Sequence, residues 1–480
     1  QVNDPADQVV CSGGTTTPVI FTTINTGGTT VYNWTNNNTG IGLAAGGTGN
    51  IPGFTAVNNG SVPAVATITV TPVFNNGIGC PGPAQTFTIT VNPTADVVQP
   101  VNQVLCNDAP TLDIVFTSGN TVGVTSYSWV NNTPSIGLAT SGDGDIPSFI
   151  AVNDGDAPVI ATIEVTPHFT FGGITCDGPS KTFTITVDPT PQIIPSTLTQ
   201  TICNNGQTFI VIGSPSVYSS GVITFEYTVT ATGGVTGFTT PVTDLPKDHV
   251  IEDILVNPTN EIQTVTYTIT PVTSTGCGSG PATVIVTVLP TPDVDEPDDQ
   301  VLCNGEDSDE VIPGTLTVGD VTFTWTNSDP SIGLPVSGDG NIPSFTAINN
   351  GDNPVVAEIR LTPHFTYDGY MCDGLPRIFT ITVNPTPRIS PVPVDVTQCD
   401  STTTNIILRS PSTFTSDLIA FRFTATATGG VTGFTPSASG LPNNHVIADN
   451  LVNPTDEPQT VTYTITPVSP VGCDDGPSVT

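Results

Sequence analysis

Basic residues are scarce in this chain. It contains seven Lys and Arg residues against 42 Asp and Glu residues, a formal net charge of −35, and its first basic residue is Lys181. Proteins that bind nucleic acid neutralise the phosphate backbone with clustered Lys and Arg. The composition therefore excludes nucleic acid as a partner, and it disfavours anionic membrane surfaces for the same reason.

Long apolar runs and helical periodicity are also missing. No run approaches the ~20 apolar residues that a membrane-spanning helix requires, so we expect no membrane insertion. Apolar residues instead alternate with polar ones, as in ATIEVTPHF from Ala161 and TVTYTITPV from Thr264, and 47 Gly and 46 Pro residues separate such runs. Alternation of period two is typical of half-buried strands, so we predict an all-β chain.

The ten cysteines contain no CxxC pair, but they recur at nearly constant spacing. They form five successive pairs, 69 to 74 residues apart within a pair: Cys11/Cys80, Cys106/Cys176, Cys203/Cys277, Cys303/Cys372 and Cys399/Cys473. The first cysteines of neighbouring pairs lie 95 to 100 residues apart. A fixed period with its own two cysteines indicates a tandem array of similar domains rather than one large enzyme.

The repeats are of two types. Type A carries a tryptophan followed by IGL, with Trp34, Trp129 and Trp325 in that position, whereas type B carries TATGGVTGF from Thr230 and Thr426. The order is A, A, B, A, B. We predict five modules, numbered 1 to 5 along the chain, at residues 1–93, 94–189, 190–290, 291–385 and 386–480.

The cysteines predict disulfides and an oxidising compartment outside the cytoplasm. We expect all ten to be bonded, with one disulfide inside each module, which in the chain-entropy model would contribute up to ~4 kcal/mol for a loop of some 70 residues. The alternative is a bond between the end of one module and the next, because spacing alone does not define connectivity.

Each repeat supplies about seven short strands, which fits an immunoglobulin-like β-sandwich. In module 2 these include LDIVF from Leu112, SYSWV from Ser126 and SFIAV from Ser148, and the tryptophan is expected in the core. Pro-Thr-Pro clusters such as Pro189/Pro191 separate the modules, and proline stiffens such joints. Five modules would form a rod on the order of 200 Å long, from the rise per residue of a strand.

The four histidines are the first candidates for catalysis. His168 and His364 share one position of the type A repeat, and His249 and His445 share one of type B. Recurrence at a framework position indicates a local structural role, and the chain has no nucleophile elbow or comparable motif. We therefore expect no enzyme.

Acidic loops are candidates for calcium, which binds carboxylate and carbonyl oxygens. The candidate ligands are Asp143, Asp145, Asp154 and Asp156 in module 2, and Asp339 and Asp352 in module 4. Module 1 has no acid at the corresponding loops, so solvated turn residues are the alternative interpretation. The run DVDEPDDQ at residues 293–300 lies at a joint, where a cation could stiffen two modules.

The repeat pattern is interrupted at the end of the sequence. Module 5 stops at Thr480, where module 2 continues through a last strand and its proline terminator. We expect that this sequence is a window from a longer protein. The alternative is completion of module 5 by a strand from a neighbour.

The motifs TYTITPV…GC…GP, TFTITVNPTP and QVLCN resemble the PKD-like and immunoglobulin-like repeats of very large Bacteroidota surface proteins, such as SprB-type gliding-motility adhesins. The resemblance covers all five modules, although YSWVNN and FTWTNS replace the WDFGDG-like signature of ordinary PKD domains. It implies export by type IX secretion, display on the outer surface and long filaments that a motility machinery moves.

We therefore expect a non-enzymatic extracellular stalk or filament of a bacterial adhesin, active in surface attachment and gliding. Its contacts with an external surface or polysaccharide would lie mostly outside this region, and self-association into filaments is possible. The alternatives are an array of glycan-binding modules, for which an aromatic content of 6% is low, and a spacer in a secreted hydrolase.

Overall fold

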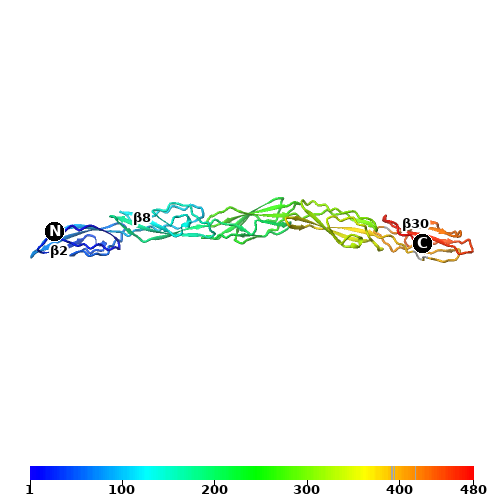
Figure 1. The fold of residues 1–480 in the computed structure, drawn as a ribbon, viewed down its shortest axis with the longest axis horizontal. Helices are drawn as coiled ribbons and strands as arrows, with labels where there is room; N and C mark the ends of the chain where they lie inside the picture. The colour runs from blue at the N-terminus through cyan, green and yellow to red at the C-terminus, as the bar shows by residue number, and fades with distance from the viewer. Residues whose placement is uncertain (391–392, 394, 417) are drawn as a thin grey trace.

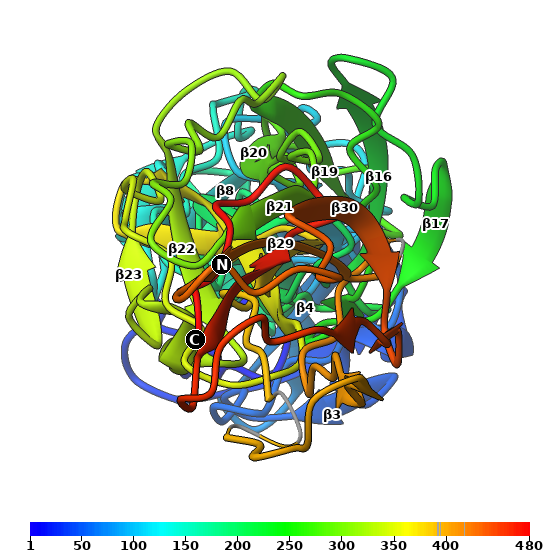
Figure 2. The same ribbon diagram turned by 90° about the vertical axis from the view of Figure 1, so that its right-hand side faces the viewer.

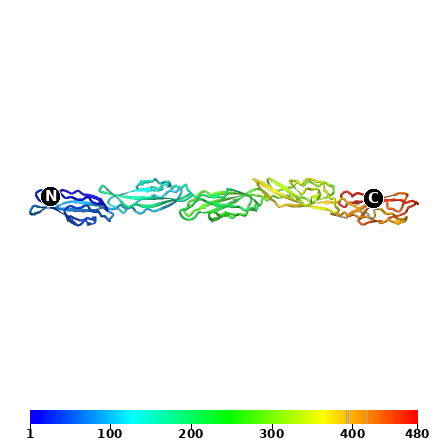
Figure 3. The ribbon, with the colours of Figure 1, turned by 60° about the horizontal axis from the view of Figure 1, so that its bottom comes forward.

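The computed structural model describes residues 1–390, 393, 395–416 and 418–480. The chain forms an elongated rod in which five bodies follow one another from the N-terminus to the C-terminus (Figure 1). The same five bodies are separate from one another in a second view across the rod (Figure 3). Viewed along its length, they lie behind one another within a narrow outline (Figure 2). The predicted all-β tandem array is confirmed.

Type A modules share one sheet topology. In module 1 the sheet order is β1-β6-β4-β2-β3, with β5 paired to the far end of β4, and modules 2 and 4 repeat it. The first strand runs parallel to the last one, and the other pairs are antiparallel. The strands of module 1 are β1 (Gln8–Cys11), β2 (Thr29–Asn36), β3 (Gly46–Thr48), β4 (Ala64–Asn75), β5 (Gly79–Pro81) and β6 (Gln85–Asn92).

The other two type A modules have the same elements in the same order. Module 2 has β7 (Gln103–Cys106), β8 (Val124–Asn131), β9 (Ser141–Asp143), β10 (Val159–Phe171), β11 (Ile174–Asp177) and β12 (Lys181–Asp188). Module 4 has β21 (Gln300–Cys303), β22 (Val321–Asn327), β23 (Ser337–Asp339), β24 (Val355–Tyr367), β25 (Tyr370–Asp373) and β26 (Arg377–Asn384). A 3₁₀ turn follows the tryptophan strand in each type A module: η1 (Thr39–Ile41), η2 (Pro134–Ile136) and η3 (Pro330–Ile332).

Module 3, of type B, keeps the type A strand order in its main sheet and adds a second sheet. Module 3 contains β13 (Ile194–Pro195), β14 (Thr199–Cys203), β15 (Ile210–Gly213), β16 (Thr224–Ala231), β17 (Val242–Leu245), β18 (Val250–Ile251), β19 (Gln263–Val272) and β20 (Ala282–Leu289). Its main sheet has the order β14-β20-β19-β16-β17, and β13-β15-β18 form the second sheet. The second sheet completes the sandwich.

Module 5 repeats part of this arrangement. Its strands are β27 (Thr402–Thr403), β28 (Ile406–Ile407), β29 (Ala420–Ala427), β30 (Ser437–Pro442), β31 (Val446–Ile447), β32 (Asn450–Leu451) and β33 (Val461–Val468). The sheet β30-β29-β33 corresponds to β17-β16-β19 of module 3. On the other edge of β33, Ile465 pairs with Val479 in an isolated bridge.

The second layer of a type A module is less regular than predicted. In module 2 the predicted strands LDIVF and SFIAV form no continuous ladder. Ile150 of SFIAV makes an isolated bridge to Pro110, and Ile114 of LDIVF makes one to Ile146. The strand prediction for these two segments is therefore wrong, although both segments lie where the second layer requires them. Pro110 has no amide hydrogen, so it cannot donate to a continuous ladder.

The tryptophans lie in the core, as predicted. Trp34, Trp129 and Trp325 are buried in modules 1, 2 and 4. In module 2, a side chain on Gly142 of β9 would meet the indole ring of Trp129 at 2.3 Å, so this strand position requires glycine. Type B modules fill the corresponding space with Phe225 and Tyr227, both buried.

Each of the five main hydrophobic clusters draws its buried residues from one predicted module. A sixth cluster contains Leu289, Phe365 and Cys372, and thus spans modules 3 and 4. The modules are therefore separate cores that meet at packed joints. The boundary residues themselves stay predictions.

Gly374, two residues after the second cysteine of module 4, is expected to be essential for the stability of that module. A Cβ on Gly374 would lie 1.9 Å from the carbonyl oxygen of Pro292, and backbone atoms have little freedom to move away. We expect Gly374→Ala to destabilise module 4 by about 1–3 kcal/mol, the range typical of overpacking. Gly280→Ala is the control, because a Cβ at that position would have no neighbour within 4 Å. Hydrogen exchange of β24 measures the effect, and equal protection in both variants would contradict it.

Among the residues that the structure describes, no helix has the length and apolarity to cross a membrane.

Candidate functional site at the joints between modules

The disulfides lie at the joints between modules. The structure pairs eight of the ten cysteines, and each bond joins the first-strand cysteine of one module to the hairpin cysteine of the next. The pairs are Cys11–Cys176, Cys106–Cys277, Cys203–Cys372 and Cys303–Cys473, with Cα–Cα distances of 5.4 to 5.7 Å. The prediction of one disulfide inside each module is therefore wrong, and the alternative pairing between modules is the one found.

The parallel first strand explains this connectivity. In module 2, Cys106 ends β7 level with Asp188, at the end of the last strand β12. Cys176 instead faces Phe169 near the opposite end of β10. The two cysteines are thus about ten strand residues apart, or roughly 33 Å at 3.3 Å per residue. A disulfide needs Cα atoms within about 7 Å, so the two can bond only to neighbouring modules.

Cys80 and Cys399 were predicted to be bonded, but in the described structure both are exposed free thiols. Cys80 is the hairpin cysteine of module 1, and its expected partner Cys11 is bonded to module 2. Cys399 is the first-strand cysteine of module 5, and its expected partner Cys473 is bonded to module 4. Because each disulfide joins one module to the next, these two cysteines have no partner in the described structure.

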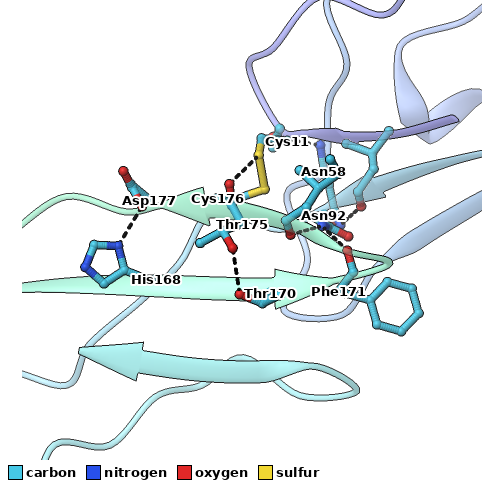
Figure 4. Close-up of a disulfide and its surroundings, with 12 residues drawn as sticks. Cys11, Asn58, Asn92, His168, Thr170, Phe171, Thr175, Cys176 and Asp177 are labelled. Atoms are coloured by element: carbon cyan, nitrogen blue, oxygen red, sulfur yellow. Dashed lines mark hydrogen bonds and ion pairs between the residues drawn. A yellow bond between two sulfur atoms is a disulfide. The ribbon is translucent and has the colours of Figure 1, made fainter. Parts of the chain in front are cut away.

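At the first joint, the hairpin β10–β11 of module 2 reaches back onto the end of module 1 (Figure 4). The side-chain amide of Asn92, at the end of β6, donates to the carbonyl oxygens of Phe171 and Ile174 at 2.9 and 3.2 Å. Asn92 is fully buried. The hydrogen bonds and the adjacent disulfide from Cys11 to Cys176 therefore hold the hairpin from two sides.

The residue at the position of Asn92 differs in chemical character from joint to joint. At the joint of modules 2 and 3 it is Asp188, which is fully buried and accepts from the amide and the hydroxyl of Ser219 at 2.8 and 3.0 Å. Between modules 3 and 4 it is Leu289, which packs with Phe365. Asn384 between modules 4 and 5 accepts from the amide of Thr415 at 3.1 Å. One position thus serves as a polar or an apolar contact, and its partner changes to match.

Tyr218 adds a hydroxyl to the joint of modules 2 and 3. Burial, and secondarily the negative charge of Asp188, raise the pKa of Tyr218 to about 12. The phenol therefore stays protonated at neutral pH and donates to the carbonyl oxygen of Pro189 at 3.3 Å. This bond ties module 3 to the proline segment that links it to module 2.

One backbone hydrogen bond recurs at all four joints. An amide that precedes the core-aromatic strand donates to a loop carbonyl of the preceding module at 2.8 to 2.9 Å: Thr121 to Ser61, Val217 to Asp156, Val318 to Asn260 and Thr413 to Asp352. The acceptor always lies three residues after an asparagine that donates to the last strand of its own module: Asn58, Asn153, Asn257 and Asn349. Each joint therefore has at least two fixed attachments, one covalent and one from the backbone.

Asp188 offers a direct test of a polar joint. We expect Asp188→Ala to remove the acceptor of the Ser219 amide, which is a hydrogen bond to a charged group and contributes about 1.5–3 kcal/mol. Hydrogen exchange at Ser219 should accelerate by about tenfold to a hundredfold, since each 1.4 kcal/mol corresponds to a factor of ten. Ser219→Ala is the milder control, because it removes the hydroxyl and keeps the amide bond. Unchanged exchange in Asp188→Ala would show that this contact does not hold the joint.

The type A histidines connect three strands on the outer face of the sheet. His168 Nδ1 lies 2.6 Å from Asp177 Oδ1, and its Nε2 lies 2.8 Å from Ser128 Oγ. His364 makes the same two contacts with Asp373 and Thr324. In module 2 the histidine lies between a serine and an aspartate, as in the catalytic triads of hydrolases. The sequence did not predict that these three side chains lie close together.

The strand position of Ser128 argues against nucleophilic catalysis. Ser128 lies within β8, paired on one side with Thr166 of β10 and on the other with Asp143 of β9. Its backbone therefore belongs to the sheet, whereas an oxyanion hole needs amides that point at the substrate. The contacts instead fasten the hairpin that carries Cys176, next to Asp177, to the sheet.

The type B histidines act through their backbones. His249 and His445 donate their amides to the carbonyl oxygens of Pro246 and Pro442, and accept from the amides of Ile212 and Leu408. The type B cores contain another polar pair, in which the Tyr267 hydroxyl donates to Asp253 at 2.7 Å and the Tyr463 hydroxyl donates to Asp449 at 2.6 Å. Burial, together with the neighbouring carboxylate, raises the pKa of each tyrosine.

The calcium candidates of module 2 lie in two separate segments, one at the end of β9 and one in the loop before β10. Asp145 accepts from the amide of Phe116 at 2.8 Å, and the carbonyl oxygen of Asp156 accepts from Val217 at the joint. Asp143 lies on β9, and Asp154 is exposed in the loop before β10. Among the described residues, no group of three or more acidic, histidine or cysteine side chains is placed to hold a metal.

In module 4, Asp339 is the last residue of β23. Asp352 Oδ1 lies 3.5 Å from Nη1 of Arg388 in module 5. The run at residues 293–300 contains structural acids. Partial burial alone would raise the pKa of Asp293, but hydrogen bonds from Thr317, Thr315 and Leu316 hold it below its usual range. Asp299 accepts from the amide of Thr380 at 2.6 Å. Calcium binding stays an untested prediction.

Residues 200–292 and 397–479 each match the family model of the PKD-like domain. These two segments correspond closely to the type B modules. No curated protein matches the chain.

Solved structures similar to this chain include arrays of cadherin and immunoglobulin domains, at low overall similarity. Drosophila N-cadherin EC1-4 is 13% identical, with 79% of this chain and 99% of that chain covered and a TM-score of 0.25. Sidekick-1 immunoglobulin domains 1–5 are 12% identical, covering 98% and 95%, with a TM-score of 0.22. The N-terminal eight Ig domains of Down Syndrome Cell Adhesion Molecule are 12% identical, covering 98% and 67%, with a TM-score of 0.22. The PKD-like matches and the sheet topology together support a region of immunoglobulin-like repeats.

Proposed function

We propose that this chain is a non-enzymatic, load-bearing stalk outside the cell, which holds an adhesive region away from the surface of a bacterium. The observation that carries the proposal is the disulfide across every joint. Disulfides persist in oxidising compartments outside the cytoplasm. A bond inside a module would protect that module alone, whereas a bond across a joint also keeps neighbouring modules together under tension.

The charge of the surface supports the same role. With 42 acidic and seven basic residues, neighbouring rods repel one another and stay soluble. The joints combine covalent, backbone and buried contacts, so bending at a joint must break several interactions at once. A stiff, acidic rod is therefore suited to holding an adhesive region at a distance from the cell surface.

Gliding motility and export by type IX secretion are the finer part of the proposal, and they rest on the resemblance of the repeats to Bacteroidota surface adhesins. In that setting the rod would be the shaft of a filament that a motor carries along the cell. Adhesive contacts with a surface or polysaccharide would come from other parts of the protein.

Live-cell tracking with an antibody against residues 94–290 tests the proposal. Labels that travel along the surface support a gliding adhesin, and labels that stay fixed at the surface support a static adhesive stalk. Labels found only in the medium would overturn the stalk and favour the spacer of a secreted hydrolase. Binding of the purified rod to a glycan array would favour the alternative of a glycan-binding array.

A further inference from the structure

The four disulfides overlap along the sequence. The cysteines of each bond are 165 to 171 residues apart, whereas the first cysteines of neighbouring modules are only 95 to 100 residues apart. Every disulfide loop after the first one therefore begins inside the loop before it, as Cys106 lies inside the loop from Cys11 to Cys176. Taken together, the loops contain every peptide bond from Cys11 to Cys473.

The overlap encloses the segments that connect the modules. With one disulfide inside each module, a cut between a hairpin cysteine and the next first-strand cysteine would fall outside every loop and release the two parts. In the structure, each of these segments lies inside one loop, and the segment between the two cysteines of modules 2, 3 and 4 lies inside two. The connecting segments are residues 81–105, 177–202, 278–302 and 373–398.

We propose that the overlapping disulfides make this rod tolerant of proteolysis, so that a protease that cuts any one peptide bond between Cys11 and Cys473 leaves a single covalent molecule. Each cut consumes one water and creates a new carboxylate and a new amine, but at least one disulfide still joins the two parts. This property goes beyond the stalk role, because it holds in any oxidising compartment where the bonds persist.

Several cuts are tolerated as well. One cut between the two cysteines of each of modules 2, 3 and 4 produces four fragments. The first fragment is then bonded to the second and the third, and the fourth fragment is bonded to the same two. The four disulfides thus join the fragments into a closed ring, in which each fragment is held by two bonds.

The two lysines of the chain, Lys181 and Lys247, provide natural sites for a lysine-specific protease. Lys247 is exposed in the turn between β17 and β18, and proteolytic cuts concentrate at such turns. Lys181 is the first residue of the paired strand β12, so we expect cleavage to occur first at Lys247. The peptide bond after Lys247 lies inside two of the four loops.

Val101 offers a sharper site in a connecting segment. Val101 is 81% exposed and lies outside any strand, shortly before β7. Val101→Lys therefore places a lysine on an exposed segment, and Lys247→Gln in the same chain removes the other exposed lysine. Of the four loops, only that of Cys11 and Cys176 contains the bond after position 101. With one disulfide inside each module, no loop would contain it.

The test uses the full chain with its four internal disulfides. Cys80 and Cys399 are alkylated first, so that their exposed thiols cannot exchange with the disulfides. The wild-type protein and the variant with Val101→Lys and Lys247→Gln are then digested with the lysine-specific protease. On denaturing gels without reductant, each should remain one molecule, with the mass of the chain plus one water per cut. With reductant, the wild type should separate after position 247 and the variant after position 101.

The control carries the same two substitutions together with Cys11→Ser and Cys176→Ser. Its parts should separate after digestion without any reductant, because the remaining three loops do not contain the cut. Three results would overturn the proposal. These are separation of the digested wild type without reductant, separation of the variant that retains all its cysteines without reductant, and parts of the serine control that stay joined.

Discussion

Pulled by its two ends, the oxidised rod is expected to stop extending at about 400 Å even when every module is unfolded, against about 1,700 Å for the reduced chain, at roughly 3.5 Å per residue. The reason is a covalent short cut through the disulfides. One of two equally short routes runs from Gln1 to Cys11, across to Cys176, on to Cys203, across to Cys372, back to Cys303, across to Cys473 and on to Thr480. Its stretches of 10, 27, 69 and 7 residue steps total about 113 of the 479 in the chain. The other route goes from Cys176 back to Cys106, across to Cys277 and on to Cys303, and has the same total.

Single-molecule force spectroscopy measures this limit, and variants show which bonds set it. Double substitution of Cys106 and Cys277 by serine should leave the limit unchanged, since the equally short route through Cys203 and Cys372 remains. Loss of the bond between Cys11 and Cys176 should lengthen the route to about 138 steps, or about 480 Å, through Cys106–Cys277 and Cys303–Cys473. An oxidised wild-type rod that extends by several hundred ångströms beyond 400 Å would contradict the connectivity.

Phe365→Ala is expected to destabilise module 4 by about 3–5 kcal/mol, the range for deleting a buried phenylalanine. Phe365 is 1% exposed and packs with Leu289 of the preceding module. The variant removes part of a core and part of the apolar joint at once. Hydrogen exchange of peptides from β24, and from the end of β20 across the joint, should report both losses.

Phe74→Ala in module 1 is the matched control. Phe74 has the same place at the end of β4, beside Gly28 as Phe365 is beside Gly319, but no module covers it among the described residues, and it is only partly buried. We expect Phe74→Ala to destabilise module 1 by about 1–2 kcal/mol, because the Phe74 side chain buries less apolar area than that of Phe365. Equal costs at the two positions would show that the preceding module contributes nothing to the stability of Phe365.

Much of the fold could be predicted from the sequence because strand periodicity is a local property. The alternation in ATIEVTPHF predicts β10, and the tryptophan in SYSWV lies in the core of module 2 as expected. The segments around Leu112 and Ser148 were harder to predict. Their pairing is limited to isolated bridges, and such pairing depends on the partner segment more than on local alternation.

The joints could not be predicted from spacing, because the pairing of cysteines depends on which end of a module each one occupies. One signal was nevertheless available. If the QVLC strand runs parallel to the last strand, then Cys106 lies at the end of that strand, and Cys176, in the hairpin before it, lies at the other. Asp188 and Leu289 also stand at one repeat position with opposite polarity. An acid and a leucine at one buried position indicate that the partner surface changes from joint to joint.

Peptide mapping of the oxidised, unreduced chain by mass spectrometry tests the connectivity between modules most directly. We expect one linked pair of peptides that contains Cys106 and Cys277, and another that contains Cys203 and Cys372. Peptides that link Cys106 to Cys176, or Cys203 to Cys277, would place the disulfides inside modules. That result would contradict both the covalent joints and the load path that the proposed stalk depends on.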